Sequence, residues 1–231
     1  MSKNILLIGG SYGIGKTIAE TLAKNNQVIV ASRSADGFES NNIKHLTFDA
    51  TKDDSSTLEL PDDLHGFVYC PGSINLRPFK NLRNEIFEED FQLNFMAMVR
   101  ALKGALPNLL KTENASIVLF STVAVKMGMP FHTSVSASKG AIEGFAKAFA
   151  AEYAPKLRCN VIAPSLTDTP LSERLLGDDR KKENAAEKHP LKRVGETKDI
   201  AAMANFLLSE ESSWITGQVF GVDGGMSTLK V

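Results

Sequence analysis

The sequence predicts a single α/β domain, a three-layer, doubly wound fold around a mostly parallel sheet of seven strands. Short apolar runs rich in Val, Ile and Leu alternate with longer segments of helical period, which is typical of repeated strand–helix–strand units. The runs show little polar–apolar alternation, which indicates strands covered by helices on both faces. The chain has 231 residues and no Pro/Ser-rich linker, so at about 150 residues per domain we expect one large domain.

The individual elements follow from this pattern in chain order. We expect strands at residues 4–8, 27–32, 45–48, 66–70, 116–121, 158–163 and 218–222, and helices at residues 14–25, 88–111, 134–154 and 197–209. The connection from residue 49 to residue 66 is short and polar, so we expect only a turn or two of helix near residues 55–60.

One segment, residues 170–193, has no evident place in the sheet. It is rich in charged residues and contains two prolines, and we expect a mobile flap outside the core that acts as a substrate lid. Within it we expect Leu171, Leu175 and Leu176 to point inward. We expect the charges of residues 178–188 to belong to a solvated helix.

Composition and charge exclude several classes of protein. Hydrophobic residues make up 43% and charged residues 23% of the chain, which excludes a disordered or collagen-like chain. The 26 basic and 27 acidic residues give a formal net charge of -1, so there is no overall field for nucleic acid or an anionic membrane. No apolar run approaches the ~18 residues that span a bilayer, and no signal peptide is evident, so we expect a cytoplasmic protein. Cys70 and Cys159 lie in apolar runs, as expected of reduced core thiols rather than a disulfide or a metal site.

A glycine-rich loop follows the first predicted strand. It reads Gly9-Gly10-Ser11-Tyr12-Gly13-Ile14-Gly15. Glycines permit a tight turn and let a pyrophosphate approach backbone amides at the positive end of the following helix. A purely structural turn is the alternative, but the place between a strand and a helix favours a dinucleotide site.

Further motifs follow the glycine loop in order. They are Asp49, Cys70-Pro71-Gly72, Asn94, Ala137-Ser138-Lys139, Asn160 to Pro164-Ser165, Thr169 and the stretch Thr216 to Gly225. Together with the loop, they resemble the short-chain dehydrogenase/reductase family, in its common single-domain class, over essentially the whole chain. The chain departs from the family at residues 70–72, where Asn-Ala-Gly is usual, and at Ser165, where a glycine is usual. The resemblance implies a Rossmann-type fold and an oxidoreductase that uses a nicotinamide cofactor on a small-molecule substrate.

The resemblance also implies which residues hold the cofactor. They are Gly9, Ser11, Tyr12, Gly13, Ile14, Gly15, Ser32, Arg33, Asp49, Ala50, Cys70, Pro71, Gly72, Lys139, Pro164, Ser165, Thr167 and Thr169. Ser32 and Arg33 stand at the end of the second strand, where an acidic residue would hold the ribose hydroxyls of NAD. Ser32 can donate a hydrogen bond to a 2'-phosphate and Arg33 adds a positive charge, so NADP(H) is preferred over NAD(H). The alternatives are that Arg33 is a solvated loop charge and that Asp49 caps a short helix rather than meeting the adenine.

The catalytic set of the family is only partly present. By the resemblance, a tyrosine is the general acid and base, a lysine lowers its pKa, a serine orients the substrate oxygen and an asparagine holds a relay water. Lys139 and Asn94 match this set, and Thr122 occupies the serine position with a hydroxyl that can make the same hydrogen bond. Val135 occupies the tyrosine position, four residues before Lys139, and valine cannot transfer a proton.

Other groups are candidates for the missing proton donor. The three tyrosines are poor replacements by position: Tyr12 in the loop, Tyr69 with an expected packing role, and Tyr153 far along the helix. His132, Val135 and Lys139 are spaced i, i+3 and i+7, so they share one helix face if the helix begins early enough. His132 also matches the tyrosine position of the family's enoyl reductase branch, and a histidine can protonate an oxyanion or enolate. The alternative is that His132 is only a loop or helix-start residue.

Two functions from different classes fit these residues. The first is an NADP(H)-dependent reductase of a small or medium carbonyl, or enoyl, substrate with an atypical proton donor. The second is a catalytically impaired NADP(H)-binding protein with a sensing, scaffold or subunit role.

The two longest predicted helices are apolar around much of their circumference. Residues 88–111 and 134–154 therefore need cover on more than one side. The resemblance implies a homodimer or homotetramer through these helices, and thicker internal packing is the alternative.

Overall fold

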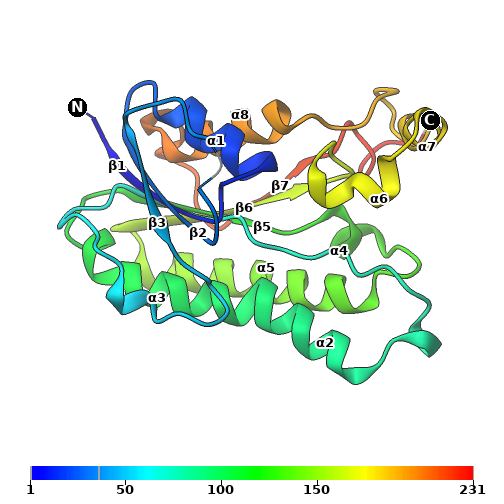
Figure 1. Cartoon of the computed structure of the whole chain (residues 1–231), viewed down its shortest axis with the longest axis horizontal. Helices are drawn as coiled ribbons and strands as arrows, with labels where there is room; N and C mark the ends of the chain where they lie inside the picture. Colours follow the sequence, from blue (N-terminus) through cyan, green and yellow to red (C-terminus); the bar gives the residue numbers. More distant parts are fainter. Residues whose placement is uncertain (1, 36, 231) are drawn as a thin grey trace.

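A seven-stranded parallel sheet forms the centre of the computed structural model, which describes residues 2–35 and 37–230 (Figure 1). The strands are β1 (Asn4–Ile8), β2 (Gln27–Ser32), β3 (Ile43–Thr47), β4 (Gly66–Tyr69), β5 (Ala115–Phe120), β6 (Leu157–Pro164) and β7 (Val219–Val222). Their order is β3-β2-β1-β4-β5-β6-β7, and every neighbouring pair is parallel. The predicted three-layer, doubly wound fold is confirmed, with a sheet that is parallel throughout.

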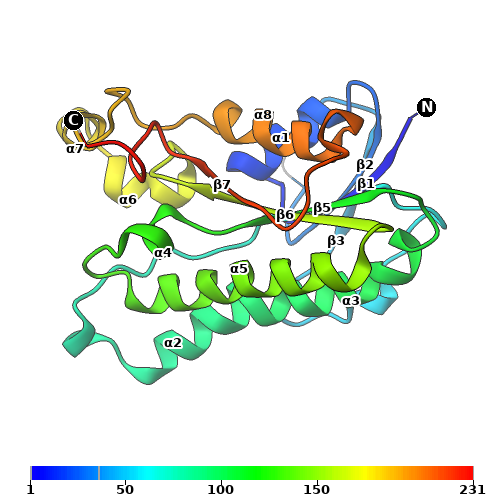
Figure 2. The same cartoon turned by 180° about the vertical axis from the view of Figure 1, so that it is seen from behind.

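Helices cover the two faces of this sheet, α2, α3 and α5 on one side and α1 and α8 on the other (Figure 1 and Figure 2). Their bounds are α1 (Gly13–Leu22), α2 (Asn84–Phe91), α3 (Ala97–Leu109), α5 (Thr133–Tyr153) and α8 (Thr197–Leu208). All six residues of β5 are buried between the two layers, which explains the lack of polar–apolar alternation in the sequence. The helices of each layer pack on the sheet through one hydrophobic cluster per face.

The predicted boundaries differ from the observed ones mainly where polar side chains decide the end of an element. The first helix ends at Leu22 rather than at residue 25, because Asn26 Nδ2 donates to the Leu22 carbonyl at 3.0 Å and helps to terminate the helix. Strand β3 begins two residues earlier than expected; it is an edge strand with no fully buried residue, so its hydrophobic signal is weak. The predicted short turn is present as a 3-10 turn at Ser55–Thr57.

The helix predicted at residues 88–111 is a longer, composite element. It begins at Asn84, runs through α2 into a π-helical turn at Gln92–Met96 and continues as α3. A regular helical period in the sequence cannot predict a π turn. Such a turn inserts one extra residue locally and often marks a functional site. Here the turn contains Asn94.

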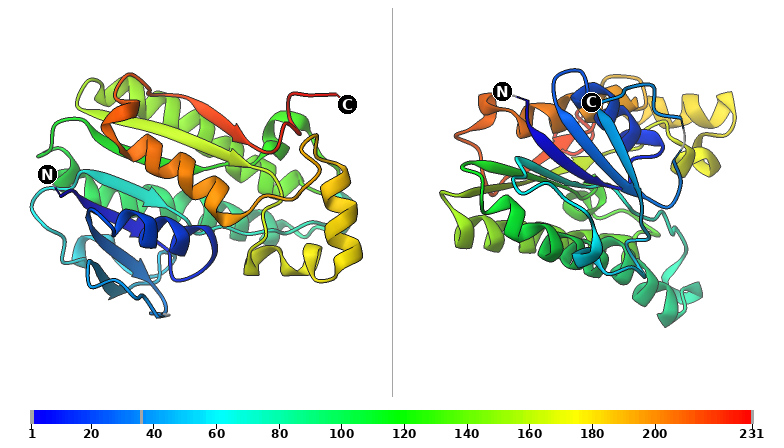
Figure 3. Two further views of the ribbon diagram at one scale, coloured as in Figure 1. Left: turned by 90° about the horizontal axis from the view of Figure 1, so that it is seen from above. Right: turned by 60° about the vertical axis from the view of Figure 1, so that its left-hand side comes forward.

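Residues 170–193 form small helices beyond the carboxyl ends of the strands (Figure 3). They comprise a 3-10 turn (Pro170–Ser172), α6 (Glu173–Leu176) and α7 (Asp179–Glu187). The C-terminal end of the chain lies next to this segment, since Leu191 N donates to the Gly224 carbonyl. No helix in the described part of the chain is both long enough and apolar enough to cross a bilayer.

Candidate active site

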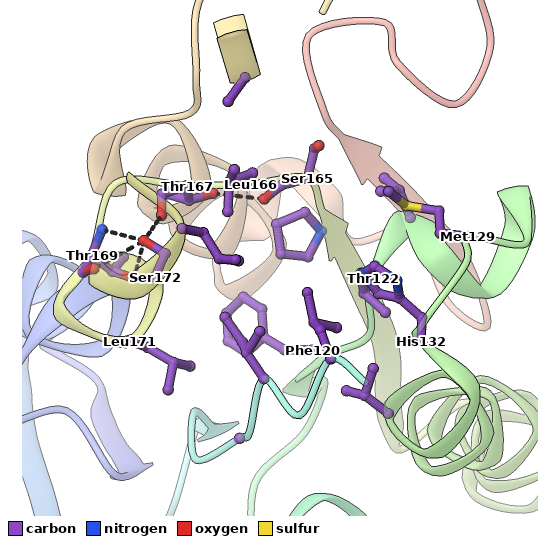
Figure 4. A pocket seen from close by; sticks show the side chains of 18 of the residues that line it. Phe120, Thr122, Met129, His132, Ser165, Leu166, Thr167, Thr169, Leu171 and Ser172 are labelled. Carbon is purple, nitrogen blue, oxygen red and sulfur yellow. Dashed lines mark hydrogen bonds between the residues drawn. The ribbon is translucent and has the colours of Figure 1, made fainter. Parts of the chain in front are cut away.

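A cavity of about 530 Å³ lies at the carboxyl ends of the central strands, beneath the 170–193 segment (Figure 4). This is the edge where the strand order reverses between β1 and β4, the usual ligand position in doubly wound sheets. Most of its lining is apolar, including Phe120, Val135, Leu166, Leu171, Leu175 and Met226. In Figure 4, Thr122, Met129 and His132 lie on one side of the cavity, and Thr169, Leu171 and Ser172 lie on the other.

The glycine loop between β1 and α1 requires its glycines. Gly9 has φ +70° and Gly13 has φ +57°, values that other residues rarely adopt. A Cβ atom on Gly15 would lie 2.7 Å from Gly10 Cα, so only glycine permits this close approach of the backbone. The loop therefore makes the tight turn between β1 and α1 that its sequence predicted.

Lys139 is the charged group in the floor of the cavity. Only 7% of it is exposed, and its Nζ atom donates to the Phe120 carbonyl at 3.0 Å. Burial lowers the pKa of Lys139 to about 8. Thr122, Val135 and His132 line the same cavity, which confirms that His132, Val135 and Lys139 share one face.

Thr122 and His132 both retain hydrogen-bonding capacity toward the cavity. Thr122 Oγ1 accepts a hydrogen bond from Ala124 N at 3.3 Å, so its hydroxyl proton is available to a substrate oxygen. His132 immediately precedes α5, and its Nδ1 atom lies 2.7 Å from the Pro130 carbonyl. Because a carbonyl only accepts, Nδ1 carries a proton and Nε2 is the atom left for proton exchange. His132 is thus both a helix-start residue and a cavity residue.

Asn94 is fully buried in the π turn beside Lys139. Its Nδ2 group donates to the Asp90 carbonyl at 2.8 Å and to Ser73 Oγ at 2.9 Å. Its Oδ1 atom accepts no hydrogen bond from any residue that the structure describes. A Cβ atom on Gly72 would lie 3.3 Å from both Asn94 Oδ1 and Lys139 Nζ. A buried acceptor without a donor, close to a buried ammonium, is what a site for a polar ligand group requires.

Asp90 is a buried carboxylate that the sequence interpretation missed. It is 1% exposed and accepts three side-chain hydrogen bonds, from Ser73 Oγ at 2.6 Å, Asn75 Nδ2 at 2.7 Å and Ser134 Oγ at 2.6 Å. The network joins α2 to α5 next to Asn94. An acidic residue at a core-facing helical position was the available signal, because such a residue is rarely buried without partners.

Ser165 and His189 form a second polar pair that the sequence interpretation did not foresee. Ser165 Oγ lies 2.8 Å from His189 Nε2, and His189 Nδ1 lies 2.8 Å from the Ala185 carbonyl. Both residues line the cavity, and His189 is only 3% exposed. Ser165, at the position where the family usually has glycine, therefore connects the end of β6 to the second residue after α7.

The tyrosines lie outside the cavity. Tyr69 is the last residue of β4, its side chain is buried in the hydrophobic cluster beneath α3 and α5, and its hydroxyl donates to the Leu93 carbonyl at 2.7 Å, which confirms a packing role. Burial raises the pKa of Tyr69 far above its usual value. Tyr153 stacks on Phe149 with ring centroids 4.4 Å apart, and Tyr12 is half exposed at the glycine loop.

The predicted contacts to the far end of the cofactor lie at the ends of β2 and β3. Ser32 is buried, its Oγ donates to the Ser34 carbonyl at 2.9 Å, and His45 Nε2 lies 3.0 Å away. Its single proton is therefore used inside the protein, whereas Arg33 is exposed. Asp49 accepts hydrogen bonds from Thr51, which lower the pKa of the carboxyl group. Asp49 thus stabilises the turn that follows β3, while Ala50 beside it is half-buried.

Most of the remaining residues predicted to hold the cofactor lie around the cavity. Ile14, Cys70, Gly72, Pro164, Ser165, Thr167 and Thr169 line the cavity. A Cβ atom on Gly9 would lie 3.0 Å from Pro71 Cδ, so Pro71 packs directly against the glycine loop. Burial raises the pKa of the Cys70 thiol to about 12, which keeps it neutral.

The 170–193 segment covers the cavity as a lid would, with one correction. Leu171 and Leu175 line the cavity as predicted, while Leu176 is buried elsewhere. The charged residues of 178–188 are exposed, as expected of a solvated helix. Two of them, Lys181 and Lys188, also line the cavity. The sequence period alone could not tell which helix face meets the cavity.

Comparison with known proteins identifies the family of the chain. Residues 9–227 match the family described as enoyl-(acyl carrier protein) reductase. The chain is 34% identical to a 3-oxoacyl-[acyl-carrier-protein] reductase of Thermotoga maritima over 146 residues, which are 63% of this chain and 58% of that relative. It is 37% identical over 171 residues to a protein of Xanthobacter autotrophicus named inactive 2-(S)-hydroxypropyl-CoM dehydrogenase 2, covering 72% of this chain and 74% of the relative.

Solved structures show the same fold over the whole chain. An aldohexose dehydrogenase of Thermoplasma acidophilum superposes with a TM-score of 0.91 at 28% identity, covering 99% of this chain and 95% of the other. A tyrosine-to-phenylalanine variant of ElxO with NADPH bound gives a TM-score of 0.89 at 26% identity, covering 99% and 100%. The fold, the glycine loop and the family match agree: the chain belongs to the short-chain dehydrogenase/reductase family of oxidoreductases.

Proposed function

We propose that the protein is an NADP(H)-dependent reductase of a small or medium carbonyl, or enoyl, substrate. The observation that carries this proposal is the placement of Thr122, Lys139 and His132 around one largely apolar cavity at the carboxyl ends of the strands. When bound, the nicotinamide cofactor supplies the hydride. The protein supplies orientation, charge and a proton.

The residues present fit such a cofactor. The glycine loop places backbone amides at the start of α1, where they can bind the phosphates. Asn94 Oδ1 and Lys139 Nζ both lie beside Gly72, so ribose hydroxyls or an ordered water there would have an acceptor and a donor. NADP(H) is preferred over NAD(H) in this proposal because Arg33 is exposed at the end of β2 and no carboxylate occupies that position. Ser32 contributes by shaping the turn, since its proton is used by Ser34.

The substrate oxygen is placed by Thr122, whose hydroxyl donates to it. The proton that Val135 cannot give comes from His132 through Nε2, the ring atom left for exchange once Nδ1 binds the Pro130 carbonyl. A water held between Asn94 and Lys139 is the competing donor.

A catalytically impaired, cofactor-binding protein is the second candidate function. It is favoured by Val135 in the cavity, by the absence of any tyrosine from the cavity lining as the structure describes it, and by a related protein that is named inactive. In this case NADP(H) binding persists and turnover does not.

One experiment separates the two functions. Oxidation of NADPH is followed with the purified protein across a panel of aldehydes, ketones and enoyl compounds, beside a fluorescence titration with NADPH. Turnover that falls at least about tenfold in His132→Ala, within the range that a general acid contributes, supports the histidine mechanism. His132→Gln is the matched control for loss of the ring. NADPH binding without turnover on any compound supports the second function.

We also propose a homo-oligomer. Phe91, Phe95, Phe145, Phe149 and Tyr153 form a continuous row of contacting rings along α2, the π turn and α5. Phe91 at its end is 38% exposed, which suits cover by a second copy. Light scattering that reports a monomer at micromolar concentration would contradict this proposal.

A further inference from the structure

The charges that line the cavity are of one sign. Lys139, Lys181 and Lys188 are among its lining residues, and no Asp or Glu is, within the part of the chain that the structure describes. A cleft with apolar walls and one sign of charge attracts the opposite charge. The cavity therefore favours a ligand with a negative group.

Helix α7 separates its charges between two faces. Lys181, Asn184, Ala185 and Lys188 have the spacing i, i+3, i+4 and i+7 and line the cavity. Asp179, Lys182 and Glu183 line a different depression on the other side of the helix. Lys182 pairs there with Asp168, and Glu187 pairs with Lys192. The acidic side chains of α7 thus all lie away from the cavity.

The two lid lysines, Lys181 and Lys188, are available for a ligand. Lys181 Nζ is 3.2 Å from Asp178 Oδ2, an exposed pair whose side chains are 54% and 53% accessible, so the contact is weak. Lys188 is exposed and has no ion pair in the described residues. Neither lysine is neutralised by a buried partner.

We propose that the lid lysines bind the anionic end of the substrate, a carboxylate, sulfonate or phosphate, while its apolar part fills the cavity and its carbonyl reaches Thr122. This inference rests on the proposed function and names its substrate class. Thr122 follows β5 and Lys139 lies on α5, whereas the lid lysines lie on α7, and apolar side chains such as Phe120, Leu166 and Leu175 line the same cavity. An amphipathic keto acid, or its sulfonate or phosphate counterpart, carries a matching group for each: a carbonyl for Thr122, an apolar chain for the walls and an anion for the lid lysines.

The test is a binding measurement that needs no turnover. Isothermal titration calorimetry is carried out with saturating NADP+, which cannot reduce a ketone, using 6-oxoheptanoate and its methyl ester. We expect the keto acid to bind about tenfold more tightly than the ester at low ionic strength, which corresponds to ~1.4 kcal/mol. The difference should shrink in about 1 M salt, where the Debye length is only ~3 Å. The sulfonate and phosphate analogues of equal length show which anion is preferred.

The variants assign the preference to the lid. Lys181→Gln/Lys188→Gln should bind acid and ester equally, whereas Lys182→Gln, the control on the outer face of the same helix, should keep the preference. NADPH affinity is measured for all three proteins and should be unchanged.

Four results would overturn the inference: equal affinity for acid and ester, binding of neither, a preference that survives in the double variant, or a fall in NADPH affinity by the same factor. The last would assign the lysines to the cofactor. Binding of the keto acid without NADPH oxidation would instead count only against the proposed reductase.

Discussion

Asn94 Oδ1 and Lys139 Nζ both lie beside Gly72, each 3.3 Å from the place where a Cβ atom of that glycine would lie. One is a buried acceptor without a donor in the described residues, and the other is a buried ammonium that donates to the Phe120 carbonyl. Asn94 lies in the π turn, and its Nδ2 group also donates to Ser138 Oγ of α5 at 3.2 Å. Lys139 lines the cavity, and Asn94 lies fully buried behind it.

Gly72→Ala should change the positions of Asn94 Oδ1 and Lys139 Nζ directly. The added methyl group would press on Asn94 Oδ1 and displace Lys139 Nζ, so we expect NADPH affinity to fall about tenfold, or ~1.4 kcal/mol, in a fluorescence titration. Gly144→Ala is the control, because a Cβ atom there meets nothing within 4 Å on the same helix as Lys139. It should keep NADPH affinity and stabilise the protein by about 0.5–1 kcal/mol. Equal affinities in the two variants would contradict the assignment.

The buried lysine should make stability depend on pH in a defined direction. Burial lowers the pKa of Lys139 from 10.5 to about 8, so the unfolded chain binds more protons than the folded chain between these two values. Stability contributed by this group therefore rises as the pH increases from about 8 to 10.5 and is constant below that window.

Lys139→Met should remove this dependence. We expect its free energy of unfolding at pH 7 to exceed that of the unmodified protein by roughly 2–4 kcal/mol, with the difference closing toward pH 10.5. Urea unfolding of both proteins across this pH range measures it, and other titrating groups cancel in the difference. A constant difference would show that Lys139 does not titrate in this window.

Val135→Tyr should restore a proton donor where the family has one. Val135 is 6% exposed and lines the cavity beside Lys139, so a tyrosine hydroxyl would enter the site. We expect kcat/KM of carbonyl reduction to rise about tenfold to a hundredfold, below the full 10²–10⁴ of an optimised general acid. Val135→Phe is the matched control, with the ring and without the hydroxyl. The same rate in both variants would mean that the hydroxyl does not act.

Asp90→Asn tests the buried carboxylate. The substitution replaces an acceptor of three hydrogen bonds by an amide that must present donors to other donors. We expect a loss of about 1–3 kcal/mol in the free energy of unfolding. Asp62→Asn, which removes an exposed ion pair with Lys111, should change it by less than about 1 kcal/mol. Comparable losses of unfolding free energy in Asp90→Asn and Asp62→Asn would show that the Asp90 network contributes no more to stability than an exposed ion pair.

Arg33→Ala should separate the two cofactors. Arg33 is exposed at the end of β2, and if it meets the 2'-phosphate, NADPH affinity falls about tenfold, or ~1.4 kcal/mol, while NADH affinity is unchanged. Lys44→Ala, an exposed cation on the neighbouring strand β3, controls for net charge. Equal NADPH and NADH affinities in the unmodified protein would contradict the proposed preference for NADP(H).

Local patterns predicted the parts of the molecule that local chemistry specifies. Strands such as β1 and β2 match their predicted bounds, and α5 is displaced by only one residue, because continuous apolar runs and helical period are properties of short segments. The glycine spacing likewise predicted the loop, because Gly9 and Gly13 adopt positive φ values, which residues other than glycine rarely adopt.

Contacts between distant segments were not predictable in this way. The Asp90 network joins residues 44 positions apart, and the Ser165–His189 pair joins β6 to the end of the lid. The sequence also did not predict the π turn, because one inserted residue leaves the apolar pattern of residues 88–111 nearly intact. These features depend on how packed elements are rotated and spaced.

By itself, the sequence determined the doubly wound fold, the tight glycine loop after β1 and the presence of a valine at position 135, because each depends on residue type and spacing. Only the tertiary structure decided what surrounds that position: a cavity with Lys139 at its floor, Lys181 and Lys188 on its lid, and the acidic side chains of α7 turned away. The physical reason is that the positions of charged side chains around a cavity, and not the net charge of the chain, determine which ligands the cavity attracts. A chain with a formal net charge of -1 can still enclose a cationic cavity once folding assigns each side chain to a face.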